Sequence, residues 1–122
     1  MRINAKRVST VALILLITLT AALFIGGHQP GSGKLFPPPW DKVVHLLFYG
    51  STATLAGLAF TRLSIPIIIL GTITLGIADE IHQIFVPGRH PGFDDLIADA
   101  VGICIAALLI PMFRKRLLPP LQ

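Results

Sequence analysis

The feature that most constrains this chain is a run of twenty residues without a charged side chain, from Val8 to Gly27. A helix of about twenty residues crosses a hydrocarbon core of about 30 Å. Basic residues precede the run, as they do in signal peptides. The run is long for a signal peptide, however, and no small-x-small cleavage site follows it before His28. We therefore predict a retained transmembrane helix over about residues 8–27.

Three further apolar runs follow, over about residues 42–61, 65–86 and 95–113. Charged residues make up only 13% of the chain, whereas a soluble domain carries about a quarter. Lipid is therefore the expected solvent, and an open sheet cannot stand in lipid because its edges stay unpaired. The predicted fold is all-α: a single domain over residues 1–122, forming an integral membrane bundle of about four antiparallel transmembrane helices.

Polar residues stand where three of these helices begin. Asp41 is the expected N-cap of the second helix, and Ser64 that of the third, with Pro66 tolerated in its first turn. Either Asp94 or Asp95 is expected to cap the fourth helix. These caps predict where each apolar run becomes helical.

Proline and glycine mark the connections and one packing surface. Residues 28–40 and the Pro87-Gly88 pair cannot sustain a helix. Gly50, Ala53 and Gly57 give the second helix a small-residue face, which lets a neighbouring helix approach closely.

Basic residues predict the orientation, because they collect on the cytoplasmic side of a membrane protein. With the N-terminus inside, seven basic residues are inside: Arg2, Lys6, Arg7, Arg62, Arg114, Lys115 and Arg116. Three are outside: Lys34, Lys42 and Arg89. Both termini are therefore expected in the cytoplasm. These residues bracket apolar runs and form no phosphate-binding face, so nucleic-acid binding is not expected. The single cysteine, Cys104, cannot form an internal disulfide.

The acidic residues are distributed less evenly than the bases. All six fall in the outer half of this topology: Asp41, Asp79, Glu80, Asp94, Asp95 and Asp99. Helix capping does not explain Asp79, Glu80 or Asp99. An ionisable group at the centre of a membrane helix costs about 2.5–3.5 kcal/mol on insertion scales, so such residues need partners, water or a ligand. Two interpretations stay open here, a binding site and a purely structural polar clasp.

Helical spacing directs these acids into the bundle. Asp41, His45 and Tyr49 are four residues apart and form one stripe. Asp95 and Asp99 form another, which Gly102 and Ala106 continue as a packing face. Asp79 and Glu80 lie one turn before Gln83. The candidate ligand-binding residues are Asp41, His45, Tyr49, Asp79, Glu80, Gln83, Arg89, Asp95 and Asp99. His45, Glu80, Gln83, Arg89, Asp95 and Asp99 are expected to converge in one pocket that opens to the outer surface.

At these residues the chain resembles the VanZ-like family of bacterial membrane proteins. Three blocks carry the resemblance: Asp41-Lys42-x-x-His45-x-x-x-Tyr49, Asp79-Glu80-x-His82-Gln83-x-Phe85-x-Pro87-Gly88-Arg89, and Asp95-x-x-x-Asp99-x-x-Gly102. Many members have asparagine where this chain has Asp99. The resemblance implies a multi-pass envelope protein of the bacterial cytoplasmic (inner) membrane. The family is named for an association with resistance to the glycopeptide teicoplanin, but it implies no particular biochemical activity.

Three functions remain in view. In the first, the outer polar pocket binds the headgroup of an envelope lipid or a lipid-linked precursor. Arg89 would then face a phosphate or carboxylate, while Tyr49 and Gln83 would supply neutral hydrogen bonds.

In the second, His45, Glu80, Asp95 and Asp99 hold a divalent cation for hydrolysis or transfer on a lipid headgroup. No dense ligand motif identifies a metal or another cofactor. In the third, the chain is a small transporter, although transport sites usually lie near the midplane and not at one face.

Overall fold

The computed structural model describes residues 4–29 and 35–118, and these residues form four helices. They are α1 (Ala5–Gly27), α2 (Trp40–Ala59), α3 (Ile65–Ile84) and α4 (Phe93–Leu117). The prediction of an all-helical fold is confirmed. Expectations that concern Arg2, Lys34 and the glycine–serine part of the first loop lie outside the described residues.

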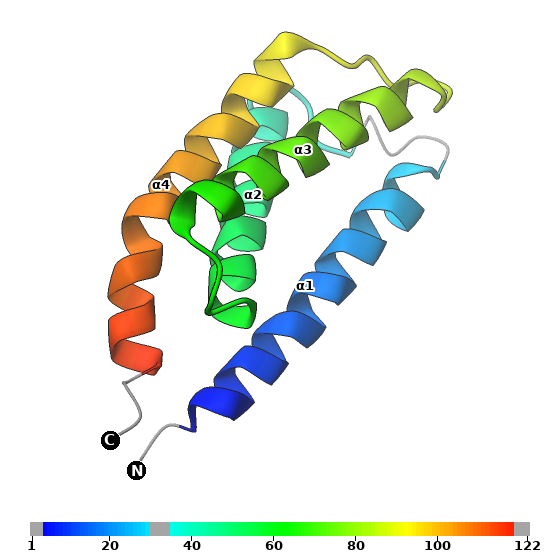
Figure 1. Cartoon of the computed structure of the whole chain (residues 1–122). Coiled ribbons are helices and arrows are strands. Elements are labelled where there is room, and N and C mark those ends of the chain that lie inside the picture. The colour runs from blue at the N-terminus through cyan, green and yellow to red at the C-terminus, as the bar shows by residue number, and fades with distance from the viewer. Residues whose placement is uncertain (1–3, 30–34, 119–122) are drawn as a thin grey trace.

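Successive helices run in opposite directions, as Figure 1 shows. The first and last described residues lie at one end of the bundle, together with the turn between α2 and α3. The C-terminal ends of α1 and α3 and the N-terminal ends of α2 and α4 lie at the other end. Helix α2 packs most extensively against α4 and next against α1, whereas α1 has few contacts with α3. Helix α2 is therefore central and contacts each of the other three helices.

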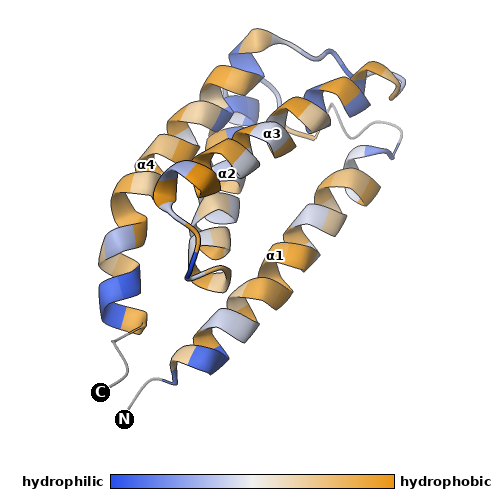
Figure 2. Ribbon diagram, in the orientation of Figure 1, coloured by the Kyte–Doolittle hydropathy of each residue, from blue (hydrophilic) through white to orange (hydrophobic). Residues whose placement is uncertain are grey.

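The surface of the bundle is apolar and its interior is partly polar. Leu108 is 81% exposed, whereas Asp99 is 2% exposed. Helices α1, α3 and α4 are long and apolar enough to cross a membrane, and Figure 2 shows hydrophobic colour along most of α1. Helix α2 falls short by composition, because its first turns carry Asp41, Lys42 and His45. The chain is therefore a multi-pass membrane protein whose exposed side chains contact the bilayer.

Glycine permits the close contact between α2 and α4. A Cβ atom on Gly102 would overlap the backbone oxygen of Leu46, and one on Gly50 would lie 3.1 Å from the oxygen of Gly102. A Cβ on Gly57 would lie 2.8 Å from Cγ2 of Ile110. The small-residue face predicted for α2 thus packs on α4. This contact holds the polar residues of the two helices at hydrogen-bonding distance.

Arg114, one of the basic residues expected on the cytoplasmic side, binds the backbone near the end of α2. Its guanidinium donates to the backbone oxygens of Gly57 at 2.9 Å, Leu63 at 2.9 Å and Phe60 at 3.2 Å. The last carbonyls of a helix have no partner within the helix. Arg114 therefore stabilises the end of α2 and the turn after it, which the sequence did not predict.

Two of the predicted N-caps are wrong. Helix α2 begins at Trp40 after Pro39, and α4 begins at Phe93 after Gly92, so neither Asp41 nor Asp94 or Asp95 is the cap. The acids lie in the first turn instead, where the helix dipole favours a negative charge. All three carboxylates lie within ion-pair distance of the ammonium group of Lys42. Ser64 does precede α3, but its side chain makes no capping hydrogen bond.

Helix ends differ from the expected ones by a few residues. Helix α3 ends at Ile84, because Phe85 and Val86 already form a turn on the carbonyls of His82 and Gln83. The turn then passes through Gly88, whose φ of +79° favours glycine. Helix α4 continues through the basic residues to Leu117. Helix α1 starts early, at Ala5, because Asn4 caps it through the backbone N–H groups of Lys6 and Arg7.

Candidate functional site

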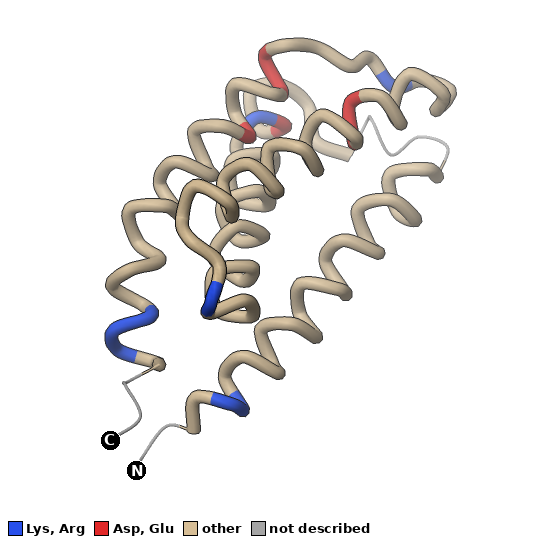
Figure 3. Tube along the Cα trace, viewed as in Figure 1, with Lys and Arg blue, Asp and Glu red and all other residues tan. Residues whose placement is uncertain are grey.

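All six acidic residues gather at the end of the bundle away from the two termini. Figure 3 shows them on α2, α3 and α4, while most basic residues lie at the opposite end. Among the described residues, Lys42 in the first turn of α2 and Arg89 in the connection from α3 to α4 are the lysine and arginine of this end. We call one group the acid-rich cluster: Asp41, Lys42, His45, Glu80, Asp94, Asp95 and Asp99. The cluster joins the start of α2, the end of α3 and the start of α4.

The rim of the cluster is organised by Lys42. Its Nζ lies 2.8 Å from Oδ2 of Asp41 and 3.0 Å from Oδ2 of Asp94, and it also binds Oδ1 of Asp95. The Asp94 side chain is 69% exposed, whereas that of Asp95 is 11% exposed. Lys42 thus ties α2 to α4 where the cluster meets the surface. The sequence placed Lys42 among the outer bases and in the first family block but not among the candidate site residues, although it lies three residues before His45 on the same helix face.

His45 lies below this rim, between Asp95 and Asp99 of α4. Its Nδ1 donates to Oδ1 of Asp99 at 2.8 Å, and its Nε2 lies 3.9 Å from Oδ1 of Asp95. The ring stacks on Tyr49 with centroids 6.2 Å apart. The predicted stripes of α2 and α4 therefore face each other, and their polar groups pair across the interface.

Two carboxylates of the cluster are buried with one oxygen each unsatisfied. Oε2 of Glu80 accepts the N–H of Gly92 at 3.0 Å. Within the part of the chain that the structure describes, Oε1 of Glu80 and Oδ2 of Asp99 have no hydrogen-bond partner. Glu80 is 7% exposed and Asp99 is 2% exposed. Buried polar atoms normally have a hydrogen-bond partner, so these two oxygens are the atoms of the site where a ligand could form new hydrogen bonds.

Three deeply buried polar side chains, those of Tyr49, Asp79 and Gln83, are joined by hydrogen bonds. Oδ2 of Asp79 accepts hydrogen bonds from the hydroxyl of Tyr49 and from Nε2 of Gln83, each at 3.1 Å. All three residues are at most 2% exposed. Tyr49 and Gln83, which the sequence assigned to a ligand, thus hold Asp79 instead. The sequence contained no signal for this pairing, because it depends on the angle between α2 and α3.

Of the six residues expected to converge, His45, Glu80, Asp95 and Asp99 lie in the acid-rich cluster, and Gln83 lies one layer deeper. A single pocket that opens to the outer surface stays a prediction. Arg89 follows α3 on the connection to α4, where its backbone N–H donates to the oxygen of Val86 at 3.2 Å.

A pair of histidines lies outside the cluster. Nδ1 of His28 lies 3.2 Å from Nε2 of His82, with the rings stacked, and Phe24 packs edge-on against His82. The contact links α1 to α3 across 54 residues of sequence, so local spacing could not reveal it.

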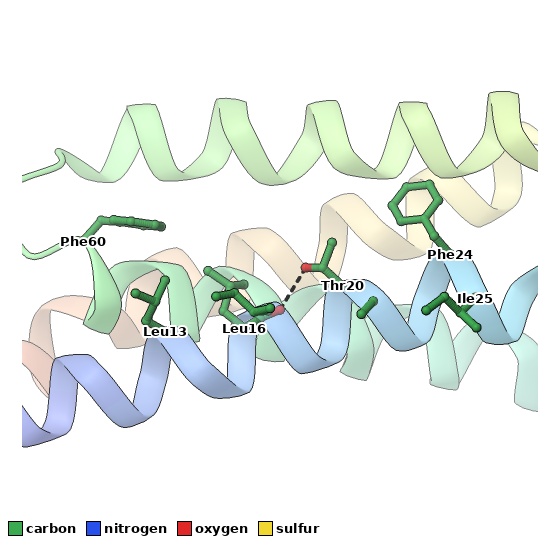
Figure 4. Close-up of a pocket in the computed structure, with 8 residues that line it drawn as sticks. Leu13, Leu16, Thr20, Phe24, Ile25 and Phe60 are labelled. Carbon is green, nitrogen blue, oxygen red and sulfur yellow. Dashed lines mark hydrogen bonds between the residues drawn. The ribbon is translucent and has the colours of Figure 1, made fainter.

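An apolar groove runs along α1, separate from the acid-rich cluster. It has a volume of about 480 Å³ and is lined by residues that include Leu13, Leu16, Phe24 and Phe60. Figure 4 shows Thr20 among them, turned back to the oxygen of Leu16 at 2.9 Å. Because the Thr20 hydroxyl is satisfied within its own helix, the groove presents an almost wholly apolar surface.

These features define a multi-pass helical membrane protein with an acid-rich cluster buried at one end. A family model described as VanZ/LLP1 matches residues 3–114, and the chain belongs to this family. The resemblance seen in the sequence blocks is thereby confirmed. No curated protein and no solved structure gives a significant match.

Proposed function

We propose that this VanZ/LLP1 protein lies in the bacterial cytoplasmic membrane and binds the headgroup of an envelope lipid or a lipid-linked precursor at the acid-rich cluster. One observation carries the proposal: two buried carboxylates, Glu80 and Asp99, each keep an oxygen without a hydrogen-bond partner among the described residues. Leaving such groups unsatisfied is costly in a membrane. A ligand that donates hydrogen bonds or positive charge would remove that cost.

The depth of the cluster supports a headgroup as the ligand. Asp94 and Asp95 lie in the first turn of α4. Asp99 lies six residues beyond Phe93, which is about 9 Å along a helix at 1.5 Å per residue. The headgroup layer of one leaflet is about 5–8 Å thick. A lipid headgroup beside α4 would therefore stand at the level of the rim and reach toward the buried acids.

The charges of the cluster restrict the headgroup chemistry. Carboxylates accept hydrogen bonds, so Glu80 and Asp99 would receive ammonium or hydroxyl groups. A phosphate would be placed nearer to Arg89, whose guanidinium offers paired donors. Tyr49 and Gln83 have no direct part, because both donate to Asp79. A contribution to teicoplanin-type resistance follows only from the family's association and is part of this proposal.

A second candidate function is metal-assisted hydrolysis or transfer on the same headgroup. It is favoured by the short distances between donor atoms of His45, Glu80 and Asp99. A cation there would polarise a phosphoryl oxygen. Chemical turnover of the bound lipid distinguishes this function from binding alone. A transporter is disfavoured because the acids lie at one end of the bundle.

The proposal requires the acid-rich cluster on the outer side, with all four helices crossing the membrane and both termini in the cytoplasm. A reporter that is active only in the cytoplasm should be active when fused after Gln122. A reporter that is active only outside should be active when inserted between Gly31 and Lys34. Both reporters are placed at each site, so that an inactive fusion at a site can be compared with an active fusion at the same site. An external C-terminus would contradict the orientation.

Headgroup binding is tested with protein in detergent micelles that contain equal amounts of phosphatidylethanolamine, phosphatidylglycerol and a polyprenyl phosphate. Native mass spectrometry should show selective retention of one of these lipids. Glu80→Gln should reduce that retention at least tenfold, because it removes the charge of a ligand-facing carboxylate. Gly71→Ala serves as the matched control, since nothing lies within 4 Å of a Cβ there. Equal retention of all three lipids by wild type and Glu80→Gln would contradict the proposal.

A further inference from the structure

Three side chains of the acid-rich cluster form a donor set that suits a metal ion. His45, Glu80 and Asp99 each offer one ligand atom, and these atoms all lie within 4.8 Å of one another. Zinc bonds to nitrogen and oxygen are about 2.0–2.2 Å long, so two ligands of one such ion lie at most about 4.4 Å apart. The three donors are close to this limit, and small movements of their side chains would bring all three onto a single ion. They come from α2, α3 and α4, so an ion would join three helices.

The unsatisfied oxygens give independent support. Oε1 of Glu80 and Oδ2 of Asp99 have no hydrogen-bond partner among the described residues, and both residues are more than nine-tenths buried. A Cβ atom on Gly76 would lie 3.2 Å from Oδ2 of Asp99. Gly76 is one turn before Glu80, so the free oxygen of Asp99 faces the same stripe of α3 that carries Glu80. The absence of a side chain at Gly76 keeps that space open.

Apart from Asp95, whose Oδ1 lies 3.9 Å from Nε2 of His45, the other polar residues here are held by partners outside this donor set. Lys42 is held by Asp41, Asp94 and Asp95, and Asp79 is held by Tyr49 and Gln83. Two ionised carboxylates and a neutral imidazole carry a charge of −2, which one divalent cation balances. A buried charge balanced in this way avoids the cost of isolated ions in a medium of low dielectric constant.

We infer that His45, Glu80 and Asp99 bind a divalent transition-metal cation such as Zn²⁺ or Mn²⁺. Imidazole with carboxylates favours these ions over Ca²⁺ and Mg²⁺, which prefer oxygen ligands alone. Three protein ligands leave at least one position of the ion open. A water molecule or a phosphate oxygen can take that position, which would let the acidic cluster accept an anionic headgroup. The metal site itself does not depend on the headgroup proposal.

The test uses the full chain, purified in detergent with a tag that contains no histidine, stripped with EDTA and dialysed. Titration with ZnCl₂ or MnCl₂ alone should give one ion per chain. Glu80→Gln and Asp99→Asn should each weaken the affinity at least tenfold. His28→Gln is the matched control. It removes a histidine of the His28–His82 pair, which lies outside the acid-rich cluster, and should leave the affinity unchanged.

Each outcome bears on the inference. Absence of stoichiometric binding by wild type overturns it, and so does a loss of binding in His28→Gln that Glu80→Gln does not show. Should wild type bind no metal yet still retain a selected lipid in EDTA, the metal site fails and the headgroup proposal stands. Should it bind one ion but retain no lipid selectively, the headgroup proposal fails and the metal site stands.

Discussion

Gly102→Val is expected to give a protein that no longer forms the native bundle in detergent. A Cβ atom at this position overlaps the backbone oxygen of Leu46, and backbone cannot move aside as a flexible side chain does. Overpacking of a core typically costs about 1–3 kcal/mol, and occasionally more. Here α2 and α4 must separate, so we expect a loss above about 3 kcal/mol. Thermal unfolding and size-exclusion chromatography measure the effect.

The same substitution links packing to the acid-rich cluster. Leu46 adjoins His45 in sequence, and Gly102 follows Asp99 by three residues, so separating the helices would break the contact of 2.8 Å between His45 and Asp99. Gly71→Ala is the control, because nothing lies within 4 Å of its added Cβ. Alanine there should be neutral or stabilise α3 by up to about 1 kcal/mol. A Gly102→Val protein as stable as wild type would show that α2 and α4 do not approach as described.

The helices and the face that carries the acids were predictable, because both depend on local sequence. Runs of apolar residues at membrane length identify three helices by composition alone. Four-residue spacing placed Asp95 and Asp99 on one buried face of α4, and the structure has both buried. The small residues of α2 likewise predicted a close neighbour.

The partners within the cluster were not predictable, because they depend on the distances between helices. Lys42 reaches across to α4, Tyr49 donates to Asp79 on α3, and His28 meets His82. Each pair joins residues at least 30 positions apart. The two wrong caps come from the helix boundaries. Helices α2 and α4 begin before Asp41 and Asp94, so these acids fall within the first turn.

The central claim is that the acid-rich cluster is a binding site and not only a structural clasp. The two interpretations predict opposite signs for the same substitutions. Glu80→Gln and Asp99→Asn keep size and hydrogen-bonding capacity while they remove a buried charge. A site would then lose ligand binding but keep or gain stability, because the cost of burying charge falls. In a clasp, removal of Asp99 strands His45, and loss of one partner of a buried pair costs about 3–5 kcal/mol.

Thermal unfolding of metal-free protein in detergent tests this most directly, with both variants measured beside wild type in EDTA. Tyr49→Phe serves as a control of sensitivity, because it removes a donor from buried Asp79 and should cost about 1–3 kcal/mol. We predict that Glu80→Gln and Asp99→Asn unfold at or above the temperature of wild type. Marked destabilisation of both, comparable to Tyr49→Phe or larger, would contradict a binding site and identify the cluster as a structural clasp.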